Sequence, residues 1–598
     1  MIRRITERQF AHFLYFYRLL GRRLLAVPAL GAIAGIMDGL GLAMFIPLMA
    51  FASQGGGTVD HAALGNLRFL TESLTAVGIT PTLTVVLLMM LGFFVFKGLV
   101  AFLAQYQKVH YAQHFISTVR ESTIIALAEY QYARYALADV GRIQNTLTTE
   151  IGRVSHAMTT YLGVINSVVL ISVYATLAFI ANAQFAVLVI IGGLLTNLGY
   201  RAIYRRTEQL SREISRQGHK LQRLVIQQSA YFKYLKATGI SQMYADKLVQ
   251  EVKRMEDTNR QIGVLSAVTG GVREPIMILV IVAVILVQVN LMGESLALML
   301  LSIMFFYRAL GHLLTLQGQW NAFLGKSGSI ANLKEFTDEL RRHKDQVGTY
   351  RFQHLTHGLE LRAVSFGYRT GATVLSNVSL TIRRNETFAL VGESGSGKTT
   401  VMNILAGLLV PTEGTCLVDG RPMTEIDVSS YQRRIGYITQ EPVIFDDSVF
   451  QNVTLWDTDT PETRERAVRA LQQAHFANFV ETLPRGMDSR LGIGGINLSG
   501  GQRQRIAIAR ELYKGIDILL MDEATASLDT ESENQLKENI EALKGRLTIV
   551  IIAHRLSTIR HADRVALVRA GTIASIGTYE DLCEQAPGFR RMVELQTI

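Results

Sequence analysis

Cysteine is almost absent from this sequence of 598 residues, which contains only Cys416 and Cys583. Both lie in the part of the chain that we expect to be cytoplasmic, so a disulfide is not expected, and their spacing offers no metal site. Charged residues are also scarce, at 18%, whereas 49% of the residues are hydrophobic and the mean hydropathy is +0.22. This composition is too apolar for an ordinary soluble protein of such length and indicates a membrane protein.

Internal repeats and nucleic-acid-binding motifs are likewise missing from the sequence. The chain is therefore expected to carry one copy of each of its domains. The net charge of +10 is the feature that would favour a nucleic-acid partner, but the basic residues flank hydrophobic stretches. We attribute most of this charge to membrane topology and expect no nucleic-acid partner.

Long apolar stretches are confined to the chain before residue 330. Each is long enough to cross a bilayer as a helix of about 20 residues. The predicted spans are 24–53, 81–106, 159–180, 184–203, 263–289 and 291–318. The fold class expected for residues 1–335 is therefore a membrane α-helical bundle of six spans, in which the segments 107–158 and 204–262 are polar and helical in pattern.

Lysine and arginine are distributed unevenly around these spans. Residues 1–23 contain six of them, 107–158 five and 204–262 twelve, whereas 54–80 contains one, Arg68. Because positive residues favour the cytoplasmic side, both termini and both long polar segments are predicted to be cytoplasmic. The bilayer is thus an expected partner of this multi-pass chain.

Two motifs in the last third of the chain indicate nucleotide chemistry. GESGSGKT (392–399) fits the P-loop pattern G-x-x-x-x-G-K-S/T, between a buried-strand pattern at 387–391 and a helical one at 401–409. Its glycines let consecutive backbone N–H groups surround a di- or triphosphate at a helix N-terminus. ILLMDE (518–523) follows about 120 residues later and has the form of the acidic strand end that such ATPases need. We therefore predict that the chain binds and hydrolyses a nucleotide.

The side chains of these motifs have separate predicted roles. Lys398 is expected to reach the β- and γ-phosphates, and Thr399 to give its hydroxyl to Mg²⁺. Asp522 is placed to hold Mg²⁺ directly or through water. Glu523, the next residue, is the candidate general base that polarises the attacking water.

LSGGQ (498–502) identifies a family: from about residue 358 to 598 the sequence resembles the ATP-binding cassette (ABC) superfamily. Further landmarks of that family are found in order at Tyr368, Gln440, SerLeuAsp (527–529) and His554. The resemblance implies an α/β P-loop ATPase domain of ABC type over 358–598, joined to residues 1–335 by a linker at 336–357.

The resemblance also implies roles for these landmarks. Tyr368 would stack on adenine, and Gln440 would couple the γ-phosphate and Mg²⁺ to the membrane domain. His554 would contact the γ-phosphate and position the water, although a strand-end histidine is also compatible with a structural role. One departure is Ile493, where exporters usually carry an acid; that loop is thought to signal between the nucleotide and membrane domains.

The predicted site therefore consists of three sets of residues. The catalytic set is Glu523, His554 and Gln440, and the Mg²⁺ set is Thr399, Gln440 and Asp522. The ATP-contacting set is Tyr368, Gly392, Glu393, Ser394, Gly395, Ser396, Gly397, Lys398, Thr399, Thr400, Ser499, Gly500, Gly501, Gln502 and Asp529.

The signature LSGGQ predicts a dimer. Ser499, Gly500 and Gly501 are expected to open a helix and so form a second anion site in a domain that has one P-loop. In the ABC family the signature of one copy closes over the P-loop nucleotide of the other. Because every motif is intact, a homodimer is the simpler expectation, with a heterodimer as the alternative.

Six spans ahead of a cassette resemble exporters of the MsbA-like (type IV) architecture, as half-transporters. In that family the two long loops carry coupling helices, expected here near 134–142 and 236–243. Ile36–Ser53, PheTyrArgAla (306–309) and NLSGGQRQRIAIAREL resemble PglK-type flippases of lipid-linked oligosaccharides more specifically. The resemblance implies an ATP-driven exporter or flippase of the bacterial inner membrane, with a lipid-linked oligosaccharide or other glycolipid as cargo. A peptide or drug exporter and an ATP-gated channel are the alternatives.

Ionisable residues inside the spans are rare and costly, and such residues usually face a cavity. They are Asp38, Lys97, Arg273, Glu274 and Arg308. One interpretation is that they form ion pairs between helices. The other is that Lys97, Arg273 and Arg308 line a cationic cavity for an anionic head group such as a pyrophosphate, because lysine and arginine suit phosphate recognition.

Overall fold

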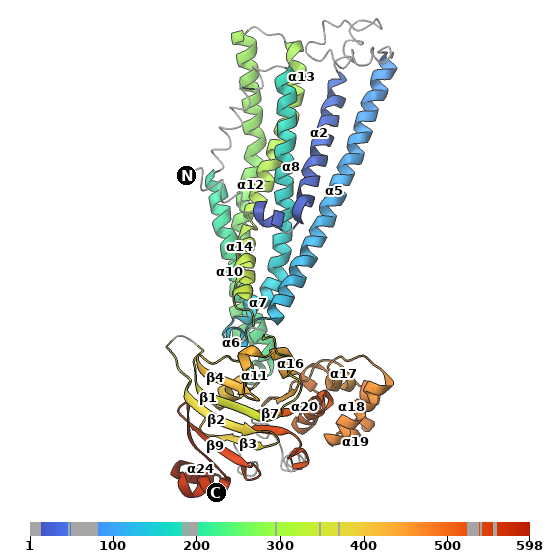
Figure 1. Ribbon diagram of the computed structural model, residues 1–598. Helices are drawn as coiled ribbons and strands as arrows, with labels where there is room; N and C mark the ends of the chain where they lie inside the picture. Colours follow the sequence, from blue (N-terminus) through green and yellow to red (C-terminus); the bar gives the residue numbers. More distant parts are fainter. Residues whose placement is uncertain are drawn as a thin grey trace. The chain divides into compact units, whose positions relative to one another are not determined.

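The chain forms two compact units (Figure 1). Unit 1 consists of Met1–Tyr130 and Ala138–His343, and unit 2 of Gln131–Leu137 and Lys344–Ile598. The computed structural model describes residues 13–18, 20–45, 48, 82–181, 187, 201–292, 296–345, 348–368, 371–522, 538, 541–553 and 559–597.

Unit 1 is a bundle of long helices. Its helical elements are η1 (Gly21–Leu25), α2 (Ala26–Ala43), α5 (Leu83–Ala128), α7 (Val140–Asn145), the π-helical turn η3 (Thr146–Glu150), α8 (Ile151–Ala181), α10 (Arg201–Ala230), α11 (Phe232–Ala237), α12 (Ser241–Met292), α13 (Leu296–Leu324) and α14 (Ser327–Arg342). The predicted helical character of the polar segments 107–158 and 204–262 is confirmed, because these helices run through both.

Two of these helices are much longer than a bilayer is thick. α5 has 46 residues and α12 has 52. At 1.5 Å per residue they extend about 69 and 78 Å, against a hydrocarbon core of about 30 Å. The predicted spans 81–106 and 263–289 are therefore each one part of a longer helix that continues into a polar segment.

Four helical stretches within the described residues are long and apolar enough to cross a membrane, by length and composition. They are Gly21–Ala43, Leu83–Ala128, Val140–Ile180 and Ser241–Val287. They overlap the predicted spans that begin at residues 24, 81, 159 and 263. The predicted span 184–203 falls almost wholly outside the described residues, and most of the span 291–318 lies in α13.

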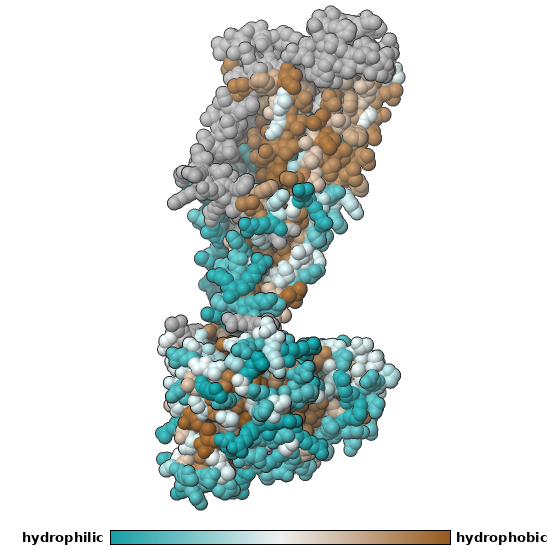
Figure 2. Space-filling model, in the orientation of Figure 1, coloured by the Kyte–Doolittle hydropathy of each residue, from teal (hydrophilic) through white to brown (hydrophobic). Residues whose placement is uncertain are grey.

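An exposed apolar surface accompanies these helices. On α5, the side chains of Leu88, Leu91 and Phe102 are 61%, 59% and 64% exposed. Figure 2 shows hydrophobic residues gathered along one stretch of the long helices and polar residues along the remainder. A surface of this size is unfavourable in water and is the surface that lipid chains cover in a bilayer.

Glycines let α2 approach α8 closely. An added Cβ on Gly35 would lie 2.6 Å from Leu170 Cδ2, and one on Gly39 would lie 2.2 Å from Leu177 Cδ1. Small residues at helix contacts are the usual means of close packing within membranes. This approach brings the polar residues of α2 and α8 to the same cavity, described below.

The described residues of unit 2 form two β-sheets. Their strands are β1 (Gly358–Phe366), β2 (Leu375–Arg383), β3 (Thr387–Val391), β4 (Glu413–Val418), β5 (Arg421–Pro422), β6 (Ile435–Ile438), β7 (Ile518–Asp522), β8 (Thr548–Ile552), β9 (Arg564–Arg569) and β10 (Thr572–Gly577). The smaller sheet is antiparallel, in the order β2-β1-β4-β5. The larger has the order β10-β9-β3-β8-β7-β6 and is parallel from β9 to β6.

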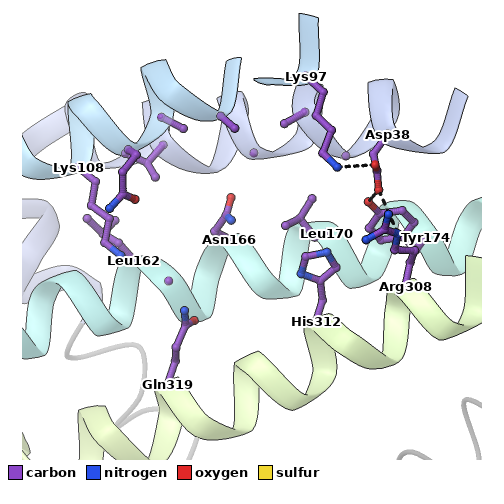
Figure 3. Close-up of a pocket in the computed structure, with 18 residues that line it drawn as sticks. Asp38, Lys97, Lys108, Leu162, Asn166, Leu170, Tyr174, Arg308, His312 and Gln319 are labelled. Atoms are coloured by element: carbon purple, nitrogen blue, oxygen red, sulfur yellow. Dashed lines mark hydrogen bonds and ion pairs between the residues drawn. The ribbon is translucent and has the colours of Figure 1, made fainter. Parts of the chain in front are cut away.

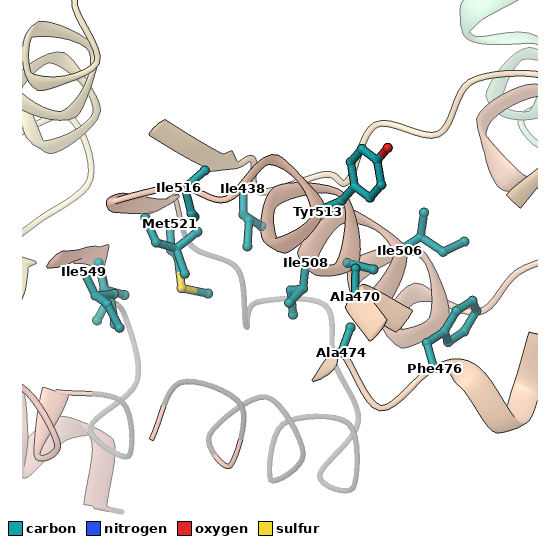
Figure 4. Close-up of a cluster of buried hydrophobic side chains, with 14 of the residues drawn as sticks. Ile438, Ala470, Ala474, Phe476, Ile506, Ile508, Tyr513, Ile516, Met521 and Ile549 are labelled. Carbon is teal, nitrogen blue, oxygen red and sulfur yellow. The ribbon is translucent and has the colours of Figure 1, made fainter. Parts of the chain in front are cut away.

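Helices complete unit 2. They are α6 (Tyr132–Tyr135), α15 (Lys398–Leu405), η4 (Met423–Glu425), α16 (Val428–Gln432), α17 (Val449–Thr454), α18 (Pro461–Gln473), α19 (Ala477–Thr482), η5 (Gly486–Asp488), η6 (Ile493–Gly495), α20 (Gly500–Lys514), α23 (Tyr579–Gln585) and α24 (Pro587–Thr597). Ile506 and Ile508 of α20 belong to one buried cluster with Met521 of β7 and Ile549 of β8 (Figure 4). Alternate residues of the same strands, such as Leu390, Leu520 and Val550, belong to a second buried cluster, so the larger sheet is apolar on both faces, as a parallel sheet requires. The predicted fold class, a membrane helical bundle fused to an α/β P-loop ATPase, is confirmed.

The stretch predicted as a linker, 336–357, contains core residues of both units. Phe336 and Leu340 lie on α14 and are 4% and 1% exposed in unit 1. Phe352 and Leu355 are 5% and 2% exposed in the core of unit 2. The segment between the units is therefore shorter than the predicted linker.

Short helices overlap the two ranges predicted for coupling helices only in part: α6 covers two residues of 134–142, whose end lies in α7, and α11 covers two residues of 236–243. α6 belongs to unit 2, where Ala133 packs against a core cluster of the ATPase. α11 belongs to unit 1 and leaves Phe232 and Tyr234 52% and 63% exposed.

Candidate functional site

The predicted nucleotide residues converge on one edge of the larger sheet. Strands β3, β8, β7 and β6 are neighbours and parallel. The P-loop follows β3, Asp522 ends β7 and Gln440 comes two residues after β6. Carboxyl ends of parallel strands meet at one edge, where open α/β sheets bind their ligands. The sheet order therefore brings together motifs that lie far apart in the sequence.

Three predicted site residues, Glu523, Asp529 and His554, lie outside the described residues. Glu523 is next in sequence to Asp522, the last residue of β7, and His554 comes two residues after the end of β8. Their roles as base, D-loop residue and γ-phosphate contact remain predictions.

The P-loop has a backbone that depends on glycine. Gly392, Gly395 and Gly397 have φ angles of 149°, 78° and 105°, which other residues rarely adopt. A Cβ on Gly392 would also lie 2.2 Å from the carbonyl oxygen of Val568. The loop can therefore curl tightly from β3 into the first turn of α15, whose N-cap is Gly397.

Lys398 and Ser396 give this loop its polar interior. Lys398 is 5% exposed, and its Nζ donates hydrogen bonds to the carbonyl oxygens of Gly392 and Glu393, each at 2.9 Å. The hydroxyl oxygen of Ser396 is buried without a hydrogen-bond partner within the described part of the chain. A buried polar group of this kind calls for a partner. A polyphosphate would supply it, so the residues present fit ATP.

The donor atoms of the three predicted Mg²⁺ residues show whether the site fits this ion. Thr399, Gln440 and Asp522 offer a hydroxyl, an amide and a carboxylate, which are the hard oxygen ligands that Mg²⁺ takes. Within the described residues no cluster of three or more His, Cys, Asp or Glu could hold a metal ion. A donor set of one hydroxyl, one amide and one carboxylate fits Mg²⁺ held jointly with nucleotide phosphates and water, as is usual for this ion.

Tyr437 is a residue of this edge that the sequence did not reveal. It lies on β6, and its hydroxyl donates a hydrogen bond to Asn403 Oδ1 at 3.1 Å. Burial raises the pKa of Tyr437, and the negative charge of Asp522 raises it further. Tyr437 thus stays a neutral donor beside the predicted Mg²⁺ residue. No motif marks it, because only the strand order places it there.

Tyr368 is held on one side and half-buried. Its ring lies 5.0 Å from that of Phe366, at an interplanar angle of 87°, and packs against the core of unit 2. An edge-to-face contact of this kind fixes a ring without covering both of its faces. The arrangement is compatible with the predicted stacking on adenine.

The signature segment opens a helix, as predicted. Ser499 is the N-cap of α20, which begins at Gly500. The Ser499 hydroxyl accepts from the Gln502 amide at 3.3 Å, and Gln502 Oε1 accepts from the Ser499 amide at 2.8 Å. This capping box fixes the first turn of a 15-residue helix, whose dipole favours an anion at this end.

The loop before the signature has an apolar surface. Ile493 and Ile496 are 81% and 80% exposed. At Ile493, where the family resemblance leads us to expect an acid, this chain therefore exposes a branched hydrocarbon side chain, and Ile496 exposes a second one nearby in the sequence.

A cavity of about 350 Å³ lies in unit 1 among α2, α5, α8 and α13 (Figure 3). Small residues such as Gly31, Ala101 and Ala104 leave the space. The polar residues that line it are Asp38, Lys97, Gln105, Lys108, Asn166, Tyr174, Arg308, His312 and Gln319. A volume of this size is in the range of small-ligand pockets, about 300–1,000 Å³.

Asp38 is the centre of a polar cluster in this cavity. It is 1% exposed, its Oδ1 lies 2.5 Å from Lys97 Nζ, and its Oδ2 accepts a hydrogen bond from the Tyr174 hydroxyl. Arg308 Nε lies 3.6 Å from the same carboxylate. His312 stacks on Tyr174, with ring centroids 5.3 Å apart. One carboxylate thus joins four helices, and we call Asp38, Lys97, Tyr174 and Arg308 the Asp38 cluster.

The structure therefore brings two of the three predicted cavity cations together. Lys97 and Arg308 both line the cavity and both pair with Asp38, whereas the side chain of Arg273 lies outside the described residues. Lys108 is a lining cation that the sequence did not reveal. The predicted span ended at residue 106, but the spacing of Lys97, Ala101, Ala104 and Lys108 along one helical face is the signal that could have found it.

Comparison with known proteins agrees with these features. The family profile described as "ABC transporter transmembrane region" matches residues 33–311, and that described as "ABC transporter" matches residues 375–526. The ATP-dependent lipid A-core flippase of Methylococcus capsulatus is 31% identical over 517 residues, covering 85% of each chain. This chain is an ABC transporter.

Other relatives support the same assignment. The heterocyst differentiation ATP-binding protein HepA of Nostoc is 30% identical over 451 residues, covering 75% of this ABC transporter and 74% of HepA. A solved bacterial Atm1-family ABC exporter with ATP bound superposes with a TM-score of 0.79 at 20% identity, over 97% of this chain and 99% of that chain, and so shares its fold. The chain thus belongs to the transporters that couple ATP hydrolysis to transport, and it shares the fold of that exporter.

Proposed function

We propose that this ABC transporter is a flippase that moves an anionic amphiphile, a phosphorylated glycolipid, from the cytoplasmic side outward. The observation that carries the proposal is the charge of the membrane cavity. The lining of the cavity includes three cations, Lys97, Lys108 and Arg308, and one carboxylate, Asp38, so the cavity of each chain has a net charge of +2. A charge in a protein cavity is costly unless it is paired, so an uncompensated positive excess favours an anionic ligand.

The volume of the cavity limits which part of the cargo can bind in it. About 350 Å³ holds a head group but not the acyl chains of a lipid. The exposed apolar surface of α5 and its neighbours offers those chains a path along the bilayer. The lipid A-core flippases among the relatives support a lipid cargo; a lipid-linked oligosaccharide is the second glycolipid that we propose to test.

In the ATPase unit, we propose the roles expected from the motifs. Lys398 and the P-loop amides bind the phosphates, and Thr399, Gln440 and Asp522 hold Mg²⁺, which supplies charge neutralisation at the phosphates when bound. Glu523 takes the proton of the attacking water. Lys398 and Ser396 support this proposal, because one is a buried cation and the other a buried hydroxyl without a partner inside the loop.

We propose further that the working form is a homodimer in the bacterial inner membrane, with both termini and the ATPase units in the cytoplasm. The capped N-terminus of α20 at Ser499 is a second anion site besides the P-loop. One nucleotide between the P-loop of one copy and Ser499 of the other would use both. The exposed aromatic residues Phe232 and Tyr234 of α11 also favour a contact with another chain.

Mixed dimers test this arrangement. Lys398→Ala and Ser499→Arg should each inactivate ATP hydrolysis alone. In a mixed dimer both defects fall on one site and leave the other intact, so mixing the two inactive chains should restore activity above either parent. Activity that stays at the parental level in mixtures with proven heterodimers would contradict the trans arrangement.

The cargo is tested in proteoliposomes of the full-length chain. Fluorescent lipid A, a lipid-linked oligosaccharide and an apolar peptide are compared for ATP-dependent translocation, with Glu523→Gln as the control without hydrolysis. We expect the phosphorylated glycolipids to move and the peptide not to. Movement of the peptide alone would contradict the proposed cargo and favour a peptide exporter.

A further inference from the structure

The two ends of the membrane cavity differ in how their charges are compensated. On α5 the lining residues run from Lys97 to Lys108, 11 positions apart, so the two lysines lie about 16 Å apart along the helix. Figure 3 shows the Asp38 cluster at one end and Lys108 at the other, with Asn166 and Gln319 between them on the side of Lys108. Each end therefore has a cation of its own.

The cations of the Asp38 cluster are already engaged. Lys97 donates to Asp38 Oδ1 at 2.5 Å, and Arg308 lies 3.6 Å from Oδ2 of the same group. Asp38 and Tyr174 are 1% and 2% exposed and lie on two different helices. An anion that enters this end has to compete with a carboxylate that is already buried and hydrogen-bonded. This end is therefore suited to holding α2, α5, α8 and α13 together.

The other end has unused hydrogen-bonding groups. Lys108 makes no hydrogen bond or ion pair with any residue in the described part of the chain. Asn166 Oδ1 is buried and has no hydrogen-bond partner among those residues. Gln319 accepts from Ser167 through Oε1 at 3.3 Å. The end thus offers an ammonium donor and an amide acceptor in one cavity.

The depth of Lys108 also matches a lipid head group. The predicted span on α5 ends at residue 106 and is followed by a segment predicted to be cytoplasmic, so Lys108 lies at the cytoplasmic limit of the apolar stretch. Phosphates of lipids in the cytoplasmic leaflet lie at this level, whereas Lys97 is well inside the span.

We propose that Lys108 binds the anionic group of the transported amphiphile and that Asn166 accepts a hydrogen bond from a neighbouring hydroxyl of the same head group. Together they select a phosphorylated sugar head group, and the Asp38 cluster joins the helices without contacting it. This inference rests on the proposed function, because it takes the cavity as the cargo site. It goes beyond that function by naming the end of the cavity, and the residue, that recognise the phosphate.

The test is binding of lipid A by the purified full-length chain in detergent, measured by titration with lipid A that carries two phosphates, one or none. Lys108→Gln should weaken binding of the two-phosphate form at least tenfold and remove the preference for it over the form without phosphate. Lys108→Arg should restore binding to within about threefold of wild type, because it keeps the charge. Arg120→Gln removes a cation from the same helix outside the cavity and should leave binding unchanged.

Each outcome decides the proposal. The proposal is overturned if wild-type binding does not depend on the number of phosphates or if Lys108→Gln binds the lipid as wild type does. An equal loss of binding in Arg120→Gln would overturn it too. A Lys108→Gln chain that fails to fold is recognised by loss of the monodisperse dimer, and Lys108→Met and Asn166→Leu then replace it. Phosphate-dependent binding without translocation in proteoliposomes would contradict the proposed function but support Lys108 as the phosphate site.

Discussion

Asp38→Asn should destabilise the membrane unit by about 2–4 kcal/mol, because it removes the charge that joins four helices. A hydrogen bond to a charged group contributes about 1.5–3 kcal/mol, and Asp38 makes one with Lys97 and one with Tyr174. Asparagine keeps the size and part of the hydrogen bonding, and it relieves the burial of a carboxylate. Lys97 and Arg308, with side chains 32% and 45% exposed, also keep part of their hydration. These effects bring the loss below the sum of two bonds.

The assay is reversible unfolding of the full-length chain in mixed micelles with increasing SDS. Asp257→Asn is the matched control, because Asp257 pairs with Arg260 at 3.4 Å on an exposed helix surface, and such pairs contribute about 0–1 kcal/mol. Tyr174→Phe should cost less than Asp38→Asn, and the double variant should cost less than the sum of the two. A loss for Asp38→Asn no larger than that for Asp257→Asn would refute the Asp38 cluster as the joint between these helices.

Further predictions concern the cytoplasmic parts of the chain. Gly392→Ala should abolish ATP binding in a nucleotide-binding titration, because its Cβ would lie 2.2 Å from the Val568 carbonyl oxygen. Gly395 has open space around it, so Gly395→Ala should lower the stability of the loop only by the strain of a positive φ, about 1–2 kcal/mol. Glu523→Gln should keep ATP binding but lose hydrolysis and accumulate the closed dimer; hydrolysis within a few-fold of wild type would show that another group is the base. Burial lowers the pKa of His219 in the folded protein below its ordinary value of 6.5. As the pH falls below 6.5, the imidazole therefore binds a proton more readily in the unfolded chain than in the folded one, and the free energy of unfolding decreases. The thermal midpoint should therefore drop between pH 7.5 and pH 5.5, and less so in His219→Gln; equal drops in both chains would contradict this role of His219.

The nucleotide motifs could be predicted from the sequence because each is a short, local pattern. The P-loop needs glycine at fixed positions, and the helix after LSGGQ is capped within four residues, so the sequence alone specifies both. Tyr437 could not be found in this way, because only the pairing of β6 with β7 brings it within the electrostatic influence of Asp522.

The membrane cavity was predicted only in part for a related reason. Hydropathy reveals the spans and the unusual charges in them, so Lys97 and Arg308 were found. It does not reveal their pairing with Asp38, which depends on how α2, α5 and α13 pack. Lys108 was missed because hydropathy ended the span at residue 106, whereas α5 continues to Ala128. A residue that lies just beyond an apolar stretch can still line the cavity when the helix continues unbroken.

ATP-driven accumulation of a phosphorylated glycolipid in one leaflet is the most direct test of the account. Proteoliposomes that expose the ATPase units outward are given external ATP and Mg²⁺, and the fraction of fluorescent lipid A in the inner leaflet is followed by quenching of the outer leaflet. The account predicts that this fraction rises beyond equal distribution in wild type and not in Glu523→Gln. Equilibration to equal fractions, or movement that does not depend on ATP, would contradict a flippase and indicate a passive channel.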